Sequence, residues 1–128
     1  MTLLLDQLTA DRAALATVHA AVTAERDALQ DALAAWPEAT TPDPLEGLEA
    51  RTVELCAGLH LRPRDHDPYL VSLPTFAQAD VDGTMGEGEY EARLRFRHLT
   101  YWHDYVWMLE VDGQRRIDGV DAEIEELS

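Results

Sequence analysis

The sequence contains no lysine: its ten basic residues are all arginine, against 25 aspartates and glutamates. A formal net charge of −15 repels a polyanion and offers no counterion release, which excludes general nucleic-acid binding. Long apolar runs are missing too, since no stretch approaches the roughly 20 residues of a membrane span. The opening residues 1–6 lack the basic flank of a secretory signal. We therefore expect a cytoplasmic protein, or a virion component assembled in the cytoplasm, that is not secreted.

Cysteine is equally scarce, because Cys56 is the only one. A single thiol cannot form an internal disulfide, and it fits a reducing compartment. A catalytic triad needs an activated serine or cysteine. Cys56 falls on the apolar face of an expected helix, and the chain has neither a Gly-x-Ser-x-Gly motif nor a phosphate-binding loop. We expect a protein that is not an enzyme and binds no cofactor.

The acidic balance concerns the environment of the protein. The chain is 46% hydrophobic and 27% charged, which is typical of one folded domain rather than of a disordered tail. Carboxylates in place of lysines favour a halophilic host. A GC-rich genome, which suppresses lysine codons, gives the same composition. A salt series separates the two, because a salt-adapted domain unfolds below about 1 M salt, where its charges are no longer screened.

Residues 1–36 contain no glycine or proline and are rich in alanine, leucine, aspartate, glutamate and arginine. This composition predicts a long N-terminal α-helix. The helix should end near Ala35, because Pro37 disfavours a helical conformation at Trp36. Large apolar residues recur at every seventh position and form one seam along it. The seam consists of Leu8, Leu15, Val22, Leu29 and Trp36.

A second, shorter helix is predicted over 43–58. Asp43 is a suitable N-cap, with Pro44 at the first helical position and Glu46 completing a capping box. Gly58 offers a left-handed C-terminal stop.

The remainder predicts an α+β fold in a single domain. Residues 59–78 read as a proline-rich extended connection, and 79–118 as a small antiparallel β-meander of three or four strands. Apolar and charged residues alternate over 89–100, as a half-buried strand requires, and Asp-Gly at 112–113 favours a tight hairpin turn. Residues 119–128 are expected to form an acidic turn or helix.

The size of the first helix has a consequence for assembly. A helix over 3–35 is about 50 Å long. A compact globule of 128 residues is only about 36 Å across. The apolar seam would therefore outreach the body that has to bury it. We expect a second chain to cover it, unless a straight helix lies across a flattened monomer.

Three arginines would share one face of the expected strand: Arg93, Arg95 and Arg97. Guanidinium groups pair well with carboxylates, so this row is a candidate contact for an acidic surface of another copy, or for an anion. The alternative is neutralisation by acids on the same sheet. Those acids are Glu89, Glu91 and Glu110.

Two acidic segments are candidate metal sites. Asp65-His66-Asp67, with His60 nearby, offers oxygen and imidazole donors. Adjacent residues in an extended segment cannot all face one ion, so a solvated loop is preferred. The segment 80–83 resembles the start of a calcium loop, but its later ligands are missing. No metal site is expected.

Residues 101–107 gather four of the nine aromatic residues of the chain, together with His103 and Asp104. One interpretation is a ligand-stacking patch or a His–Asp catalytic pair. The other, which we prefer, is an aromatic core or interface.

Together these features favour a non-catalytic, self-associating structural or assembly protein that contacts other protein subunits. The most concrete version is a small virion component, of head–tail connector or tail-completion type, from a tailed virus of a halophilic or GC-rich host. That version rests on analogy of size and architecture. The alternative is a small cytoplasmic dimer that binds a ligand or regulates a partner through the aromatic cluster.

Overall fold

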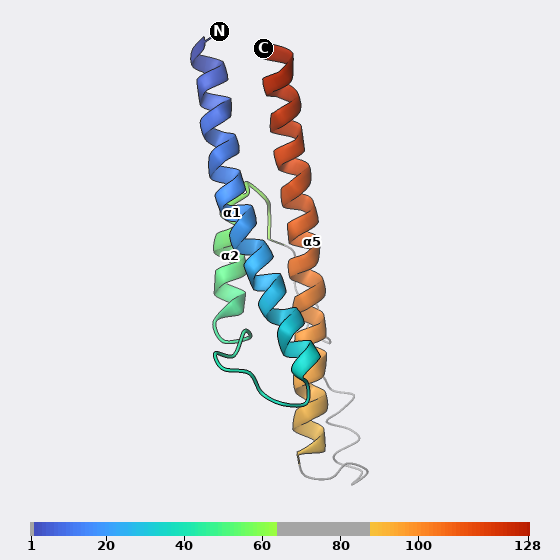
Figure 1. Cartoon of the computed structure of the whole chain (residues 1–128). Helices are drawn as coiled ribbons and strands as arrows, with labels where there is room; N and C mark the ends of the chain where they lie inside the picture. The colour runs from blue at the N-terminus through green and yellow to red at the C-terminus, as the bar shows by residue number, and fades with distance from the viewer. Residues whose placement is uncertain (1, 64–87) are drawn as a thin grey trace.

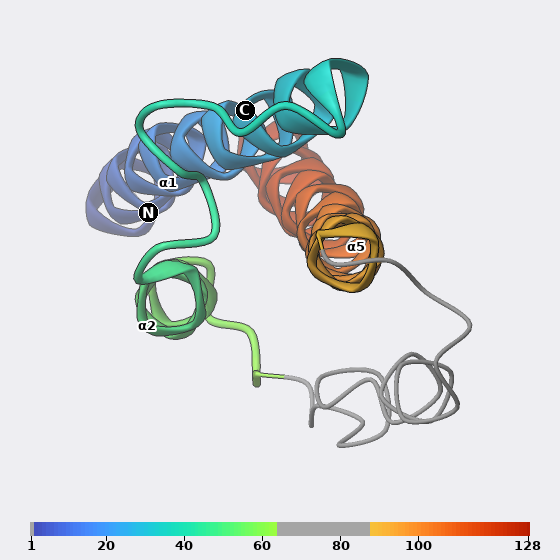
Figure 2. The same ribbon diagram turned by 90° about the horizontal axis from the view of Figure 1, so that it is seen from below.

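The computed structural model describes residues 2–63 and 88–128, and within them the chain forms three α-helices. They are α1 (Thr2–Ala35), α2 (Leu48–Gly58) and α5 (Glu89–Leu127). The long helices α1 and α5 run antiparallel along one rod, so that the start of α1 and the end of α5 lie at the same end (Figure 1). The short α2 packs beside α1 and completes a three-helix arrangement over part of the rod (Figure 2).

The first helix confirms the expectation drawn from its composition. It ends at Ala35, directly before Trp36 and Pro37. Its seam faces the other two helices, and Leu15, Val22 and Leu29 are buried in the common core.

The expected β-meander is wrong. Residues 89–118 belong to α5, which is 39 residues long, and the described part of the chain contains no strand; residues 79–87 lie outside it. The alternating pattern covers only the first turns of α5. Beyond it the inward-facing residues are spaced by three and four, which is a helical period matched to the long partner α1. They are Leu99, Trp102, Val106, Leu109, Gly113, Ile117, Val120, Ile124 and Leu127.

The hairpin turn expected at 112–113 is likewise absent. Gly113 is a buried residue in the middle of α5, and a Cβ atom there would lie 3.0 Å from Leu59 Cδ1 and 3.1 Å from His19 Cδ2. This glycine lets the three helices approach closely rather than reversing the chain. The acidic segment 119–128 is helical up to Leu127, as the end of α5 and not as a separate element.

The second helix begins later than the capping signal suggested. Asp43 Oδ1 accepts a hydrogen bond from the backbone N–H of Leu45 at 3.0 Å, so Asp43 caps a turn that precedes the helix. Gly47, with φ of 68°, is the residue before α2, which starts at Leu48. The left-handed conformation is one that glycine adopts without a steric penalty.

At its other end, α2 does not use Gly58 as the left-handed stop. The residue with positive φ is His60, at 57°, and the N–H of Leu61 closes the turn on the carbonyl of Cys56 at 2.9 Å. Gly58 is instead a packing residue, since a Cβ there would lie 2.9 Å from Val18 Cγ2. The sequence located the end of α2 correctly but assigned the wrong role to its glycine.

The length mismatch also has a different resolution. At 1.5 Å per residue α1 is about 51 Å long and α5 about 58 Å, so the body is a rod as long as the first helix. The seam of α1 is covered by α5 and α2 of the same chain. The assumption of a compact globule was wrong, and with it the reason for requiring a second chain at the seam.

Candidate functional site

The five seam residues contribute to the interior of this chain. Leu15, Val22 and Leu29 are buried, while Leu8 and Trp36 are half-buried. Trp36 donates its indole N–H to the carbonyl of Ala92 at 2.8 Å, and its ring centroid lies 5.0 Å from that of Phe96. The seam therefore holds α1 to α5.

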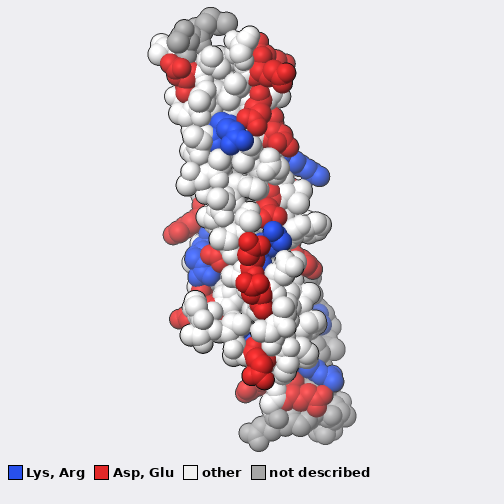
Figure 3. All heavy atoms as spheres, viewed as in Figure 1, with Lys and Arg blue, Asp and Glu red and all other residues white. Residues whose placement is uncertain are grey.

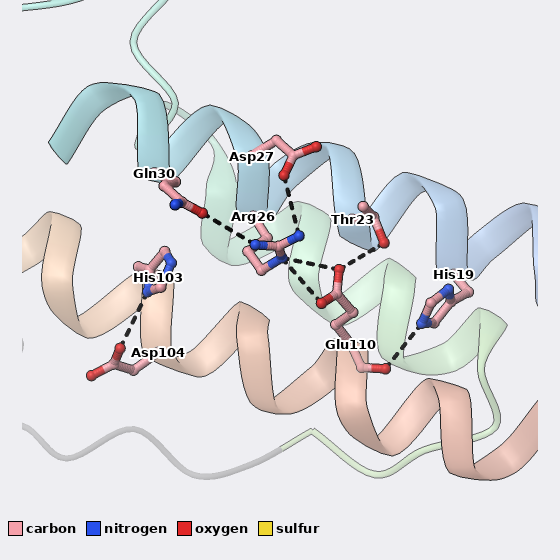
Figure 4. Close-up of polar contacts among 8 residues, drawn as sticks. All are labelled: His19, Thr23, Arg26, Asp27, Gln30, His103, Asp104 and Glu110. Carbon is pink, nitrogen blue, oxygen red and sulfur yellow. Dashed lines mark hydrogen bonds and ion pairs between the residues drawn. The ribbon is translucent and has the colours of Figure 1, made fainter. Parts of the chain in front are cut away.

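A polar cluster lies beside the seam and joins α1 to α5 (Figure 4). Glu110 of α5 accepts a hydrogen bond from the Thr23 hydroxyl at 2.7 Å, and Arg26 Nε lies 3.0 Å from Oε1 and 3.1 Å from Oε2 of the same carboxylate. His19 Nε2 lies 3.0 Å from the backbone carbonyl of Glu110. Arg26 also reaches Gln30 Oε1 at 3.1 Å on its own helix.

The charge state of Glu110 follows from these contacts. Burial by itself would raise its pKa, but the hydrogen bonds from Thr23 and Arg26 and the charges of Arg26 and His19 outweigh burial and lower the pKa. A carboxylate held ionised by donors is a poor proton acceptor. The cluster is suited to fixing the register of the two helices, and not to acid–base chemistry.

A second polar cluster joins α2 to α1. Arg51 Nε and Nη2 meet Glu25 Oε1 and Oε2 at 2.6 and 3.2 Å, which is a two-pronged pairing. The same guanidinium donates to the backbone carbonyls of Pro44, at 3.1 Å, and Glu46. Arg51 thus fixes α2, the loop before it and α1 together.

The arginines expected to form a row lie on a helix, where positions two apart point in different directions. Arg93 pairs with Glu89 at 2.8 Å on its own helix, and Arg95 Nη1 pairs with Asp43 Oδ2 at 3.0 Å. The shared strand face expected for Arg93, Arg95 and Arg97 is therefore not formed.

Asp43 is the partner through which Arg95 holds the loop before α2. Burial would raise the pKa of Asp43, but the hydrogen bonds from Arg95 and the Leu45 N–H, with the charge of Arg95, lower it. Arg95 therefore has a partner within the chain, and its contact with another copy or an anion stays a prediction.

The aromatic cluster at 101–107 is divided by the helix. Trp102 and Tyr105 are buried, with their ring centroids 5.4 Å apart, and they help to form the core. His103 Nδ1 lies 3.2 Å from Asp104 Oδ1 at the surface, where the Asp104 side chain is 66% exposed. Trp107 is 52% exposed. The cluster is thus core on one side of α5 and open surface on the other.

Cys56 is buried in the core. Burial raises its pKa, an effect that a hydrogen bond with Tyr105 only partly offsets. The thiol is therefore predominantly protonated at neutral pH and is a weak nucleophile.

Within residues 2–63 and 88–128, no group of three histidine, cysteine or acidic side chains is placed to hold a metal ion. The candidate segments 65–67 and 80–83 lie outside these residues, and His60 is exposed at the turn after α2. None of the described helices combines the length and the apolar character that crossing a membrane requires.

The outer surface carries the features that suit binding. Acidic side chains run along the whole face shown in Figure 3 and gather over the end of α5, with basic ones in only a few places. Several large apolar side chains are also exposed. They are Leu3, Leu4, Val53, Phe96, Trp107 and Met108.

Sequence reasoning named Glu110 only as a possible neutralising partner of the arginine row, and it missed Arg51 and the polar register beside the seam. In the sequence, this register is a second seven-residue spacing, formed by Arg12, His19 and Arg26. In the structure, each of these three side chains contacts α5. Comparison of the chain with protein-family models, curated proteins and solved structures finds no match.

Proposed function

We propose that the protein is a non-catalytic helical assembly protein that holds other protein subunits, its own copies included. The observation that supports this function is the exposure of large apolar side chains on helices that bury other side chains in the common core. Leu3 is 84% exposed, Leu4 51% and Trp107 52%. Large apolar side chains exposed on helices are found at protein–protein contacts.

The polar groups support the same proposal. The hydrogen bonds and ion pairs of Glu110 and Arg51 join neighbouring helices. Cys56 is buried, and the contact between His103 and Asp104 joins a half-buried imidazole to an exposed carboxylate. The chemistry of the described residues thus serves architecture.

The native mass in about 1 M salt, where surface charges are screened, tests the proposal. Light scattering should give a mass above 14.3 kDa. A ring of six or twelve copies would favour the connector type of virion component, and a dimer would favour the regulatory alternative. A monomer at every salt concentration would contradict self-association.

A pair of variants tests whether Trp107 is part of the contact between copies. Trp107→Ser should return the mass to that of a monomer, because an exposed tryptophan at the centre of an interface contributes much of its stability. Gln114→Ser is the matched control, since Gln114 lies two turns further along the same side of α5 and is already polar. It should leave the mass unchanged.

A further inference from the structure

The rod is a three-helix structure over only part of its length. The end of α2 is located by two close contacts, Gly58 against Val18 and Leu59 against Gly113. Beyond these contacts α1 and α5 continue as a pair for about 14 more residues each, or about 20 Å. We call the outer section of this part, α1 residues 2–14 and α5 residues 117–127, the hairpin tip (Figure 1).

The face that receives α2 continues into the hairpin tip. On α1, Val18 and Glu25 contact α2, and they are seven residues apart. The same register leads back through Asp11 to Leu4, whose side chain is 51% exposed. The path along which α2 lies therefore has an apolar continuation on α1.

On α5 the corresponding register runs from Gly113 to Val120 and Leu127, both half-buried. A groove of about 380 Å³ opens beside Val120 and is lined by Leu61, Gly119 and Glu123, and at the end nearer α2 by Asp112, Arg115 and Arg116. Arg115 lies 3.9 Å from Asp112, so its charge has a partner within the chain. A Cβ atom on Gly119 would meet nothing within 4 Å. Among the described residues, space for another helix thus begins where α2 ends.

The charge of the hairpin tip is predominantly negative. Residues 118–127 contain five carboxylates and no basic residue, and α1 adds Asp6 and Asp11. Arg12, the basic residue of this part of α1, is 3.0 Å from Asp121 and is thereby neutralised. Arg116, which lines the groove, donates a hydrogen bond to the backbone carbonyl of His60 at 2.8 Å.

We propose that the hairpin tip binds a basic amphipathic helix of another protein, of about 14 residues, placed in line with α2. Its apolar stripe would cover Leu4 and Val120, and its flanking lysines or arginines would meet Asp11 and Glu123. A second copy of this chain fits less well, because it would bring the same carboxylates to the same place. This inference rests on the proposed function and specifies the partner and its site.

The test is calorimetric titration of the full chain with synthetic helical peptides, at a salt concentration where circular dichroism shows the chain folded. The probe is a 14-residue peptide with leucines at helical spacing of three and four and lysines elsewhere. One control peptide has the same composition in scrambled order, and the other has glutamate in place of lysine. The leucine–lysine probe peptide should bind with a micromolar Kd. The two control peptides should bind at least about tenfold more weakly.

Variants of the chain locate the site. Gly119→Trp fills the groove and should weaken binding at least about tenfold, and Glu123→Lys should weaken it several-fold. Glu91→Lys is the matched control, because it makes the same charge change on an exposed residue at the opposite end of α5. It should leave the Kd within about twofold, since charges that far apart are screened.

Each result decides the proposal. Equal binding of the scrambled peptide, or equal loss in Glu91→Lys, would overturn it in favour of unspecific attraction to an acidic rod. If Leu4→Asp lowers the native mass, a second copy occupies the hairpin tip, which overturns the heterologous partner. If the peptide does not bind although the chain self-associates, this inference fails and the proposed function stands. If the chain is monomeric and binds no peptide, both fail.

Discussion

At the scale of single residues, Glu110 shows how a charge is tolerated between packed helices. A buried carboxylate is stable only when donors replace the water it has lost. Thr23 and Arg26 supply those donors from the facing helix, and the charges of Arg26 and His19 add to them. The pKa of Glu110 therefore lies below its ordinary value of 4.5, although burial opposes this shift.

Glu110→Gln should lower the free energy of unfolding by about 1–3 kcal/mol at pH 7, because Arg26 then lacks a charged partner. Because the pKa of Glu110 is lower in the folded state, its carboxylate stabilises the folded protein at pH values above the ordinary pKa of 4.5. This stabilisation is lost as the pH falls through the folded-state pKa. Urea unfolding at pH 7 and pH 3 should therefore show a difference between the two proteins that shrinks in acid. Asp121→Asn, which breaks the exposed pair with Arg12, should cost under about 1 kcal/mol.

Replacement by alanine should change the stability in opposite directions at two glycines of the rod. Gly58→Ala should destabilise the protein, because the new Cβ would lie 2.9 Å from Val18 Cγ2 and a β-branched side chain moves little. Gly119→Ala should stabilise it by about 0.5–1 kcal/mol, since the added methyl meets open space and improves helix propensity. Thermal unfolding of both variants measures the difference, and equal shifts would contradict the packing role of Gly58.

At the scale of elements, α1 could be predicted and α5 could not. For α1, three signals indicate the same helix: its composition, its seven-residue seam and Pro37. In α5 the local signals conflict: residues 90–96 alternate like a strand, and Asp112-Gly113 resembles a hairpin turn. The helix prevails because its inward-facing residues from Leu99 onward match a partner helix of similar length, and this is a tertiary effect.

The candidate site divides in the same way. The sequence located the seam residues, but it could not show that the same chain covers them. It singled out Arg95, whose actual partner Asp43 is 52 residues away in a loop before α2. Arg51 carried no sequence signal at all, because its value lies in bringing Glu25 and two backbone carbonyls to one guanidinium.

Arg51→Lys should loosen α2 selectively. A lysine ammonium cannot reproduce the two-pronged contact with Glu25 while also reaching the carbonyls of Pro44 and Glu46. Hydrogen exchange of the α2 amides should become about tenfold faster, whereas the amides around Val22 and Val106 should keep their protection. Uniform acceleration along all three helices would mean that Arg51 supports the whole rod rather than α2.

At the scale of the whole molecule, shape and charge act together. The accessible surface of 8127 Å² exceeds the roughly 6,800 Å² of a compact protein of this mass. On an elongated rod, like charges stand further apart than on a sphere. Even so, the carboxylates of residues 118–127 converge on the end where α1 starts. Repulsion should therefore be strongest at the hairpin tip.

Salt should consequently raise the stability of this protein, and the hairpin tip should account for much of the effect. Raising NaCl from about 0.1 to about 1 M shortens the Debye length from about 10 to about 3 Å, so the melting temperature should rise. In Glu125→Lys the rise should be smaller, because one repulsive charge has become attractive. Glu91→Lys serves as the control at the other end of α5. A melting temperature that does not change with salt would favour a GC-rich genome over salt adaptation as the origin of the acidic composition.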